Sequence, residues 1–494
     1  MFRRTVIIGK RCSSRKAVAK SSNPAMPFPC LDKLDIISAR LRQDVSNSMN
    51  DKGLNSKLSR KELGDSKNNV FEYHNISTAY QIFHSEKPLF LDYGGMLPNS
   101  KIAFETWGEL NGDKSNAILI HTGLSASSHA RSSEFDPTPG WWENFIGPGS
   151  KIVDTNKFFV ICTNVLGGCN GSTGPSSIDP ADNKHYATRF PMLSIQDIVR
   201  AQNRLIREHF GIRKLFASIG SSMGGMQSLA YGQLFPEEVE NIISISACAK
   251  SHPSSIAMRH AQRQVLMSDP NWNRGFYYPS AEHPDRIPPH VGMKLAREIA
   301  TVTYRSGPEW EYRFGNERLD DTKPPTLCPD FLVETYLDHQ GEKFSLEYDA
   351  NSLLYLSKTM DLFDLSISHL RRSEVNRRAV FENMEHGYPL CHTTAYEPRK
   401  PKKFSRTTTP QESHEDLALG MEPLRNKNLL VIGVKSDTLF PYWQQRHIVD
   451  LLGNGPNVRH IELDESQSLY GHDTFLLDTK YIGAGIGNFL ERLS

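Results

Sequence analysis

A serine flanked by glycines lies in the stretch GSSMGGM, residues 220 to 226. Ser222 is followed far along the chain by Asp437 and then by His472. These residue types suit nucleophilic catalysis: the serine hydroxyl attacks a carbonyl, the imidazole takes and returns its proton, and the carboxylate fixes the tautomer and stabilises the imidazolium. We therefore predict a catalytic triad of Ser222, Asp437 and His472.

The residues around Ser222 predict a sharp turn from a strand to a helix. The apolar run 214–220 precedes the serine, and the helix-like segment 226–236 follows it. Glycines at 220, 224 and 225 leave room for such a turn, in which a Cβ atom would clash. The backbone N–H of Met223 would then face the oxygen that becomes negative, as one donor of an oxyanion hole.

The acid and the base are each expected just beyond a predicted strand. Asp437 ends the apolar run LLVIGV, and His472 follows the run VRHIEL. Asp464 and Asp478 are weaker candidates for the acid because neither ends an apolar strand. The chain order serine, aspartate, histidine is that of the α/β-hydrolase fold.

Apolar runs alternate with amphipathic segments over much of the chain. The runs 116–121, 157–165 and 241–249 are typical of buried strands. Ser194 opens a helical pattern that ends at Gly211, and a capping box supports its start. This alternation predicts an α/β domain with a mostly parallel sheet.

The α/β pattern is interrupted, so we expect the core to be built from two parts. These are residues 81–249 and 425–494, separated by a helical lid insertion at 250–424. The insertion ends in a basic, proline- and threonine-rich loop at 398–413, which we expect to be solvated.

The N-terminal region differs in composition from the rest. Residues 1–31 contain arginines, lysines and serines, and the first acid is Asp32. This pattern is typical of a mitochondrial transit peptide, which we place within residues 1–45, with a cytoplasmic location as the alternative. Residues 32–80 are polar and predict at most a short helix, and we place a linker at 46–80.

Composition argues against several other classes. The 494-residue chain has 57 lysines and arginines against 56 aspartates and glutamates, which argues against a nucleic-acid partner. No apolar run is long enough for a membrane span. The seven cysteines include no CxxC pair and predict reduced, buried thiols, and no metal-ligand cluster has convincing spacing.

From about residue 88 to residue 485 the chain resembles the homoserine and serine O-acyltransferases of the α/β-hydrolase superfamily, the fungal serine O-acyltransferases most closely. The shared motifs are IAFETWGELN, PGWWENFIGPG, NVLGGCNGSTGPSS, RFPMLSIQD, GSSMGGMQSLAYG, SDPNW, KFSLEYDANSLLYLSKTMD, SDTLFP and GHDTF. The resemblance implies ping-pong transfer of an acyl group from acyl-coenzyme A, as a co-substrate, to an amino-acid hydroxyl. It implies no bound cofactor and, by analogy only, a homodimer.

The same resemblance implies two residues that bind the amino acid. Arg297 matches the arginine that holds the substrate carboxylate, and Asp473 matches the acid that holds the α-amino group. A zwitterion needs one fixed cation and one fixed anion, which agrees with this assignment.

One departure from the family pattern concerns the acceptor. Many acetylating members have His-x-Leu-Thr-Gly after the third strand, whereas this chain has HTGLSASSHA. The loop is expected to give a second oxyanion donor near Leu124 and to line the amino-acid pocket. We expect its changed residues, Gly123, Leu124, Ser125 and Ala126, to favour L-serine over homoserine.

The other departure concerns the donor. Arg259 stands where homoserine-acetylating members tend to have a neutral residue. Its guanidinium would bind the second carboxylate of a succinyl group through two hydrogen bonds. The alternative is an ordinary lid arginine that faces solvent or pairs with an acid, and His260 and Arg263 are weaker candidates for the same role.

These expectations combine into one reaction. We expect succinyl transfer from succinyl-CoA to the hydroxyl of L-serine, for cysteine biosynthesis. The alternatives are a serine or homoserine O-acetyltransferase that uses acetyl-CoA, and an esterase or thioesterase of the same fold.

Overall fold

A mixed sheet of eight strands forms the core of the computed structural model, which describes residues 28–51, 80–280, 282–385, 408–453 and 455–493. The two pairings β1–β4 and β4–β8 are antiparallel, and all others are parallel. The strands, in their order across the sheet, are β1 (Gln81–Ser85), β4 (Ser100–Trp107), β8 (Phe159–Thr163), β5 (Ala117–His121), β9 (Leu215–Ser221), β10 (Val239–Ile245), β11 (Asn428–Val434) and β12 (Val458–Leu463). The predicted mostly parallel α/β sheet is confirmed.

Both faces of this sheet are buried, which explains why its strands are almost continuously apolar. Leu119 of β5 packs in one hydrophobic cluster, and its neighbours Ile118 and Ile120 pack in the other. Helices α2 (Ile195–Arg204), α3 (Met223–Leu234) and α11 (Trp443–Leu452) cover the first face. Helix α13 (Ala484–Glu491) covers the second.

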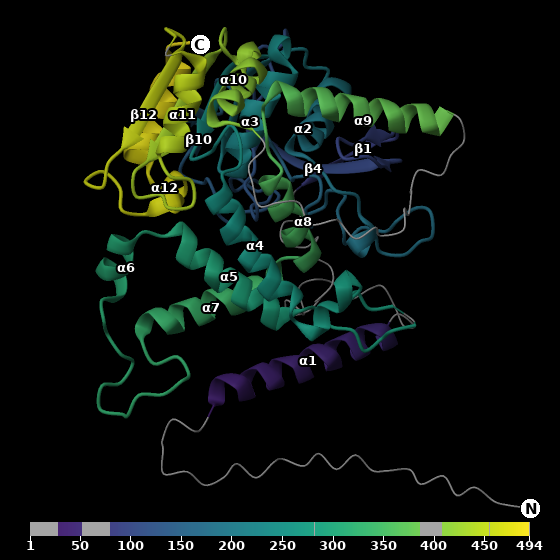
Figure 1. The fold of residues 1–494 in the computed structure, drawn as a ribbon, viewed down its shortest axis with the longest axis vertical. Coiled ribbons are helices and arrows are strands. Elements are labelled where there is room, and N and C mark those ends of the chain that lie inside the picture. Colours follow the sequence, from purple (N-terminus) through teal and green to yellow (C-terminus); the bar gives the residue numbers. More distant parts are fainter. Residues whose placement is uncertain (1–27, 52–79, 281, 386–407, 454, 494) are drawn as a thin grey trace, which may run out of the picture.

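Helices α4 to α8 form a lid, which lies below the sheet in Figure 1. The chain enters the lid after β10 and leaves it before α9. The lid helices are α4 (Pro253–Met267), α5 (His290–Tyr304), α6 (Gly307–Phe314), α7 (Leu332–Glu347) and α8 (Ala350–Asp361).

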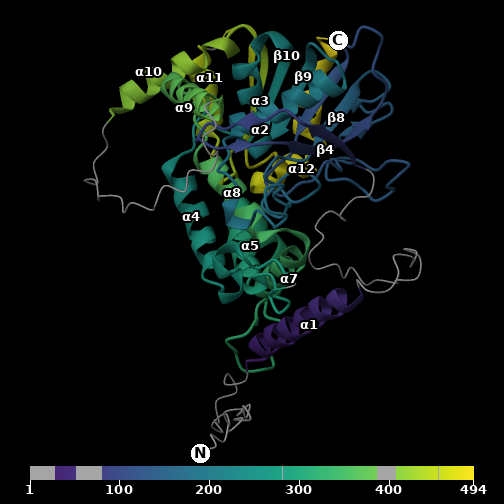
Figure 2. The same ribbon diagram turned by 90° about the vertical axis from the view of Figure 1, so that its right-hand side faces the viewer.

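The rest of the predicted insertion returns to the core. Helices α9 (Ile367–Glu385) and α10 (Pro410–Gly420) lie beside the sheet in both ribbon views (Figure 1, Figure 2). Phe381 of α9 meets Phe90 edge-on, and Leu417 of α10 belongs to the main core cluster. The insertion is therefore a lid followed by two core-covering helices. Most of the basic loop 398–413 lies outside the described residues.

A long N-terminal helix, α1 (Pro29–Asp51), lies across the far side of the lid (Figure 1, Figure 2). Leu41 and Val45 pack on Ile287 of the lid. This helix corrects the expectation that residues 32–80 hold at most a short helix, and it crosses the expected boundary at residue 45. The helix was not predicted because its sequence is polar, and its sequence is polar because only a narrow stripe of the helix is buried.

A disulfide joins Cys30 of α1 to Cys328 of the lid. The expectation of reduced thiols is therefore wrong for this pair. It agrees with the structure for Cys162, Cys169 and Cys248, which are buried and free. Cys12 and Cys391 lie outside the described residues. Within the part of the chain that the structure describes, no helix is long and apolar enough to cross a membrane.

Candidate active site

Ser222 stands on the turn between β9 and α3, as the glycine spacing predicts. Its backbone has φ 58° and ψ −124°, a strained conformation for a residue with a side chain. A Cβ on Gly224 would lie 2.2 Å from the carbonyl oxygen of His121, and one on Gly220 would lie 2.0 Å from that of Gly224. Strand and helix can therefore approach closely only because these residues are glycines.

The acid and the base form a buried pair. Nδ1 of His472 lies 2.6 Å from Oδ2 of Asp437. The other carboxylate oxygen accepts the backbone N–H groups of Leu439 at 2.9 Å and Phe440 at 2.8 Å. The carboxylate accepts the Nδ1 proton, so Nε2 carries the lone pair. Nε2 is buried and has no hydrogen bond to any residue that the structure describes, which leaves it available as a base.

The end of lid helix α5 packs directly on the loops that carry this pair. The hydroxyl of Thr438 donates to the carbonyl of Thr303 at 2.8 Å. A Cβ on Gly471 would lie 2.7 Å from the carbonyl oxygen of Tyr304, so the chain next to His472 touches the lid without an intervening side chain. The lid therefore covers the loops of both the acid and the base.

The predicted oxyanion loop follows β5 and is held from the core at its start. The side-chain amide of Gln227 donates to the carbonyl of Thr122 at 2.9 Å. Gly123, Leu124 and Ala126 are half-buried, and Ser125 is exposed. Met223 is the first residue of α3, where a helix leaves its N–H groups without an intrahelical acceptor.

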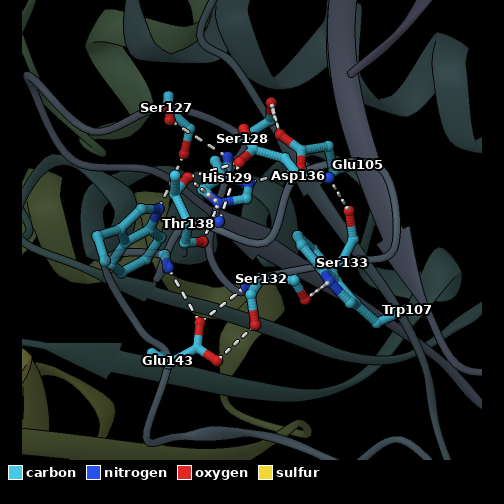
Figure 3. A network of polar contacts seen from close by, with 12 residues as sticks. Glu105, Trp107, Ser127, Ser128, His129, Ser132, Ser133, Asp136, Thr138 and Glu143 are labelled. Atoms are coloured by element: carbon cyan, nitrogen blue, oxygen red, sulfur yellow. Dashed lines mark hydrogen bonds and ion pairs between the residues drawn. The ribbon is translucent and has the colours of Figure 1, made fainter. Parts of the chain in front are cut away.

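The far end of the same loop is held by a buried ion pair that the sequence analysis missed (Figure 3). Glu105 of β4 accepts the hydroxyl of Ser128 at 2.9 Å and Nδ1–H of His129 at 2.9 Å. Nε2–H of His129 donates to the carbonyl of Thr138 at 2.8 Å. Both ring nitrogens face acceptors, so the ring is an imidazolium. The Glu105 carboxylate accordingly raises the pKa of His129 to about 9.

The two residues assigned to the amino acid lie at the junction of lid and core. Arg297 of α5 places its guanidinium 4.5 Å from the ring centroid of Phe344, and its Nε has no partner among the described residues. Burial raises the pKa of Asp473, while the positive charges of Arg305 and Arg297 act against that rise. The junction of lid and core thus holds a cation, and an anion that directly follows the predicted base in the chain.

Arg305 is a further residue of this site that the sequence analysis missed. Its Nη2 lies 3.4 Å from Oδ2 of Asp473. It also pairs with Glu309, which keeps the guanidinium in place. Its position could have been predicted, because Arg305 lies about two helical turns beyond Arg297 in the same helix-like segment.

Arg259 is buried in the lid, with 3 % of its surface exposed. Its Nε lies 2.6 Å from Asp361, and its Nη2 lies 3.3 Å from the hydroxyl of Ser251. The structure therefore has the acid-paired arrangement that we set out as the alternative. Nη1 of Arg259 nevertheless lacks a partner among the described residues. His260 is exposed, and Arg263 binds Asp361 and Ser357.

Known proteins share this architecture and much of this sequence. A family model described as the alpha/beta hydrolase fold matches residues 116–476. Serine O-succinyltransferase of Emericella nidulans is 56% identical over 95% of this chain and 89% of its own. Serine O-succinyltransferase of Schizosaccharomyces pombe is 50% identical over 96% of each chain. The crystal structure of a homoserine O-acetyltransferase from Bacillus anthracis has a TM-score of 0.64 at 24% identity, over 84% of this chain and 97% of its own. The chain belongs to the serine and homoserine O-acyltransferase family of the α/β-hydrolase superfamily.

Proposed function

We propose that this protein is a serine O-succinyltransferase, which moves the succinyl group of succinyl-CoA to the hydroxyl of L-serine. The observation that carries the proposal is that the core–lid junction holds both a cation and an anion: Arg297, whose Nε has no partner among the described residues, and Asp473, which directly follows His472 and feels the charge of Arg297. A hydrolase that uses water as acceptor needs no such pair, whereas an amino-acid acceptor carries one charge for each member.

In the first half-reaction the succinyl group moves from coenzyme A to the enzyme. Ser222 Oγ attacks the thioester carbonyl while His472 Nε2 takes its proton. The N–H groups of Met223 and of loop 123–125 hold the oxyanion. When the intermediate collapses, the C–S bond breaks, the proton on His472 passes to the sulfur, and free coenzyme A departs.

In the second half-reaction L-serine takes the place of coenzyme A. Arg297 binds its carboxylate and Asp473 binds its ammonium group. His472 removes the hydroxyl proton, the oxygen attacks the succinyl ester, and the proton returns to Ser222 as the ester bond breaks. The lid excludes water, which would otherwise hydrolyse the acyl-enzyme.

The choice of succinyl as donor rests on Arg259. Its unpartnered, buried Nη1 offers a hydrogen bond and a positive charge that acetyl cannot use. The residue already neutralises Asp361, so a succinyl carboxylate would share the guanidinium with that acid.

Acetyl transfer to homoserine is the second candidate. A Cβ on Gly123 would meet no atom within 4 Å, so there is space beside the loop for a longer acceptor. One additional methylene is discriminated by only about 1–3 kcal/mol in such a pocket.

A four-way comparison of substrates tests the proposal. Release of coenzyme A is measured with succinyl-CoA or acetyl-CoA, each with L-serine or L-homoserine and each without an acceptor. We expect the highest kcat/KM for succinyl-CoA with L-serine. The highest value for acetyl-CoA with homoserine would overturn the proposal, and equal release without any acceptor would indicate a thioesterase.

The donor assignment has its own matched pair of variants. Arg259→Ala should lower the kcat/KM ratio of succinyl-CoA over acetyl-CoA by tenfold or more. Arg263→Ala removes a second arginine from the same carboxylate and should leave that ratio unchanged. An equal change of the ratio in both variants would assign Arg259 to lid structure alone.

We further propose that the enzyme serves cysteine biosynthesis as a homodimer in the mitochondrion. The basic N-terminal segment supports import, and the packing of α1 on the lid favours cleavage before Pro29 rather than near residue 45. Cell fractionation with N-terminal sequencing of the mature chain tests both points. An intact first residue in a cytoplasmic fraction would contradict them.

A further inference from the structure

Two aromatic side chains of the lid lie between the assigned amino-acid site and the oxyanion loop. Phe344 of α7 carries the guanidinium of Arg297 over its ring at 4.5 Å from the centroid. Tyr348, one turn further on, stacks on Phe344 with ring centroids 5.3 Å apart and an interplanar angle of 13°. The Tyr348 hydroxyl donates to the backbone carbonyl of Leu124 at 2.8 Å. A continuous line of contacts thus joins Arg297 to the loop.

The contact from Tyr348 meets the middle of the loop, between its two anchors in the core. Thr122 is held by Gln227, and Ser128 is held by Glu105. Burial raises the pKa of Tyr348 well above its usual value, so its hydroxyl stays protonated and acts as a donor. The bond at Leu124 therefore has its donor proton at neutral pH.

A hydrogen bond to this carbonyl controls the direction of an N–H group. The carbonyl of Leu124 and the N–H of Ser125 belong to one peptide unit, which is trans. In a trans peptide the two groups point in opposite directions. Holding the oxygen toward the lid turns the Ser125 N–H away from Tyr348, whereas a flipped peptide would present a carbonyl oxygen in its place.

We propose that Tyr348 is a positioning residue for acyl transfer: its hydroxyl fixes the peptide between Leu124 and Ser125, and its stack on Phe344 ties that peptide to Arg297. The inference rests on the proposed function, in which this loop supplies an oxyanion donor. An oxyanion forms in both half-reactions, so Tyr348 acts on both. Phe344 acts on the amino-acid step, because its ring lies against the guanidinium of Arg297, which binds the acceptor.

The variant Tyr348→Phe tests the inference because it removes the hydroxyl and keeps the ring. Tyr355→Phe is the matched control: Tyr355 also donates its hydroxyl to a backbone carbonyl at 2.8 Å, that of Thr188, away from the loop. We expect Tyr348→Phe to slow both the single-turnover release of coenzyme A without acceptor and kcat by tenfold or more. The KM for L-serine and the melting temperature should match those of Tyr355→Phe. Equal rates in the two variants would overturn the inference.

A second variant and a second probe separate the inference from the function on which it rests. Phe344→Leu should raise the KM for L-serine by tenfold or more and leave the single-turnover release of coenzyme A unchanged. Slower release would mean that Phe344 also supports the oxyanion loop, which would contradict the separate roles given to Phe344 and Tyr348. Hydrolysis of p-nitrophenyl acetate needs the triad and the oxyanion hole but no amino acid. Slower hydrolysis in Tyr348→Phe would support the positioning role even if the protein transferred no acyl group from any acyl-CoA to any amino acid. Unchanged hydrolysis would contradict it while leaving the acyltransferase proposal intact.

Discussion

Two acids beside the catalytic histidine have different surroundings, and this separates their roles. Asp437 is occupied on both oxygens, by His472 on one and by two backbone N–H groups on the other. Asp473 is held less completely, with Arg305 at 3.4 Å. The first acid therefore serves the base alone, by orienting it and stabilising its imidazolium, whereas the second still has capacity for an ammonium group.

The role of Asp473 predicts a selective defect. Asp473→Asn should raise the KM for L-serine by roughly 10- to 150-fold, the equivalent of about 1.5–3 kcal/mol for a hydrogen bond to a charged group. Burial raises the pKa of this acid, so in the parent enzyme the KM should rise as the pH falls toward that pKa and the carboxylate becomes protonated. The variant should lose this pH dependence. Steady-state kinetics at several pH values measure both effects.

The control for this experiment is Glu465→Gln, which removes one exposed negative charge from the preceding loop. It should leave the KM and its pH dependence unchanged. Acylation by succinyl-CoA without acceptor should be normal in both variants. Slow acylation in Asp473→Asn would instead mean that this acid supports His472.

At the scale of the elements, the turn at Ser222 depends on glycines that admit no side chain. Gly224→Ala should lower the free energy of unfolding by about 3 kcal/mol, because the new Cβ meets the backbone of β5 and not a mobile side chain. Gly112→Ala is the control, since a Cβ there would meet no atom within 4 Å. Chemical denaturation of both variants measures the difference. Equal stability would show that β5 and α3 can move apart.

The ion pair at the end of the oxyanion loop predicts a stability that depends on pH. The pKa of His129 rises from 6.5 to about 9 on folding, so its contribution is complete below about 6.5 and is lost as the pH rises through 9. The stability difference between the parent chain and His129→Gln should therefore shrink over that interval. Denaturation at pH 6, 7.5 and 9.5 would reveal it, with the exposed His260→Gln as control. A constant difference would contradict a charged His129.

Local patterns in the sequence predicted the elements of the site, whereas contacts between residues far apart in the sequence could not be predicted. The turn at Ser222, and the placement of Asp437 and His472 on the loops that follow β11 and β12, could be predicted from residues nearby in the sequence. The bond from Tyr348 to Leu124 joins residues 224 apart and leaves no mark on either segment. The role of Glu105 could not be predicted for the same reason, because an acid within a strand does not indicate which loop it will bind.

At the scale of the whole molecule, the N-terminal helix is a separate layer over the lid. A disulfide, an apolar contact and an ion pair between Lys33 and Glu342 hold α1 on the lid helices. The lid in turn packs on the loops of Asp437 and His472. The disulfide and the contacts that hold α1 in place therefore also restrain the lid over the proposed active site.

Reduction of the disulfide should loosen this outer layer and leave the core unchanged. Breaking the bond between Cys30 and Cys328 frees one end of α1, while Leu41 and Val45 keep only a small apolar contact. Hydrogen exchange should increase in α1 and around Cys328 after addition of a thiol reductant, with no change in the central strands. Cys30→Ser should show the same pattern without reductant. Peptide mapping that finds free thiols at both positions in the oxidised protein would contradict the prediction.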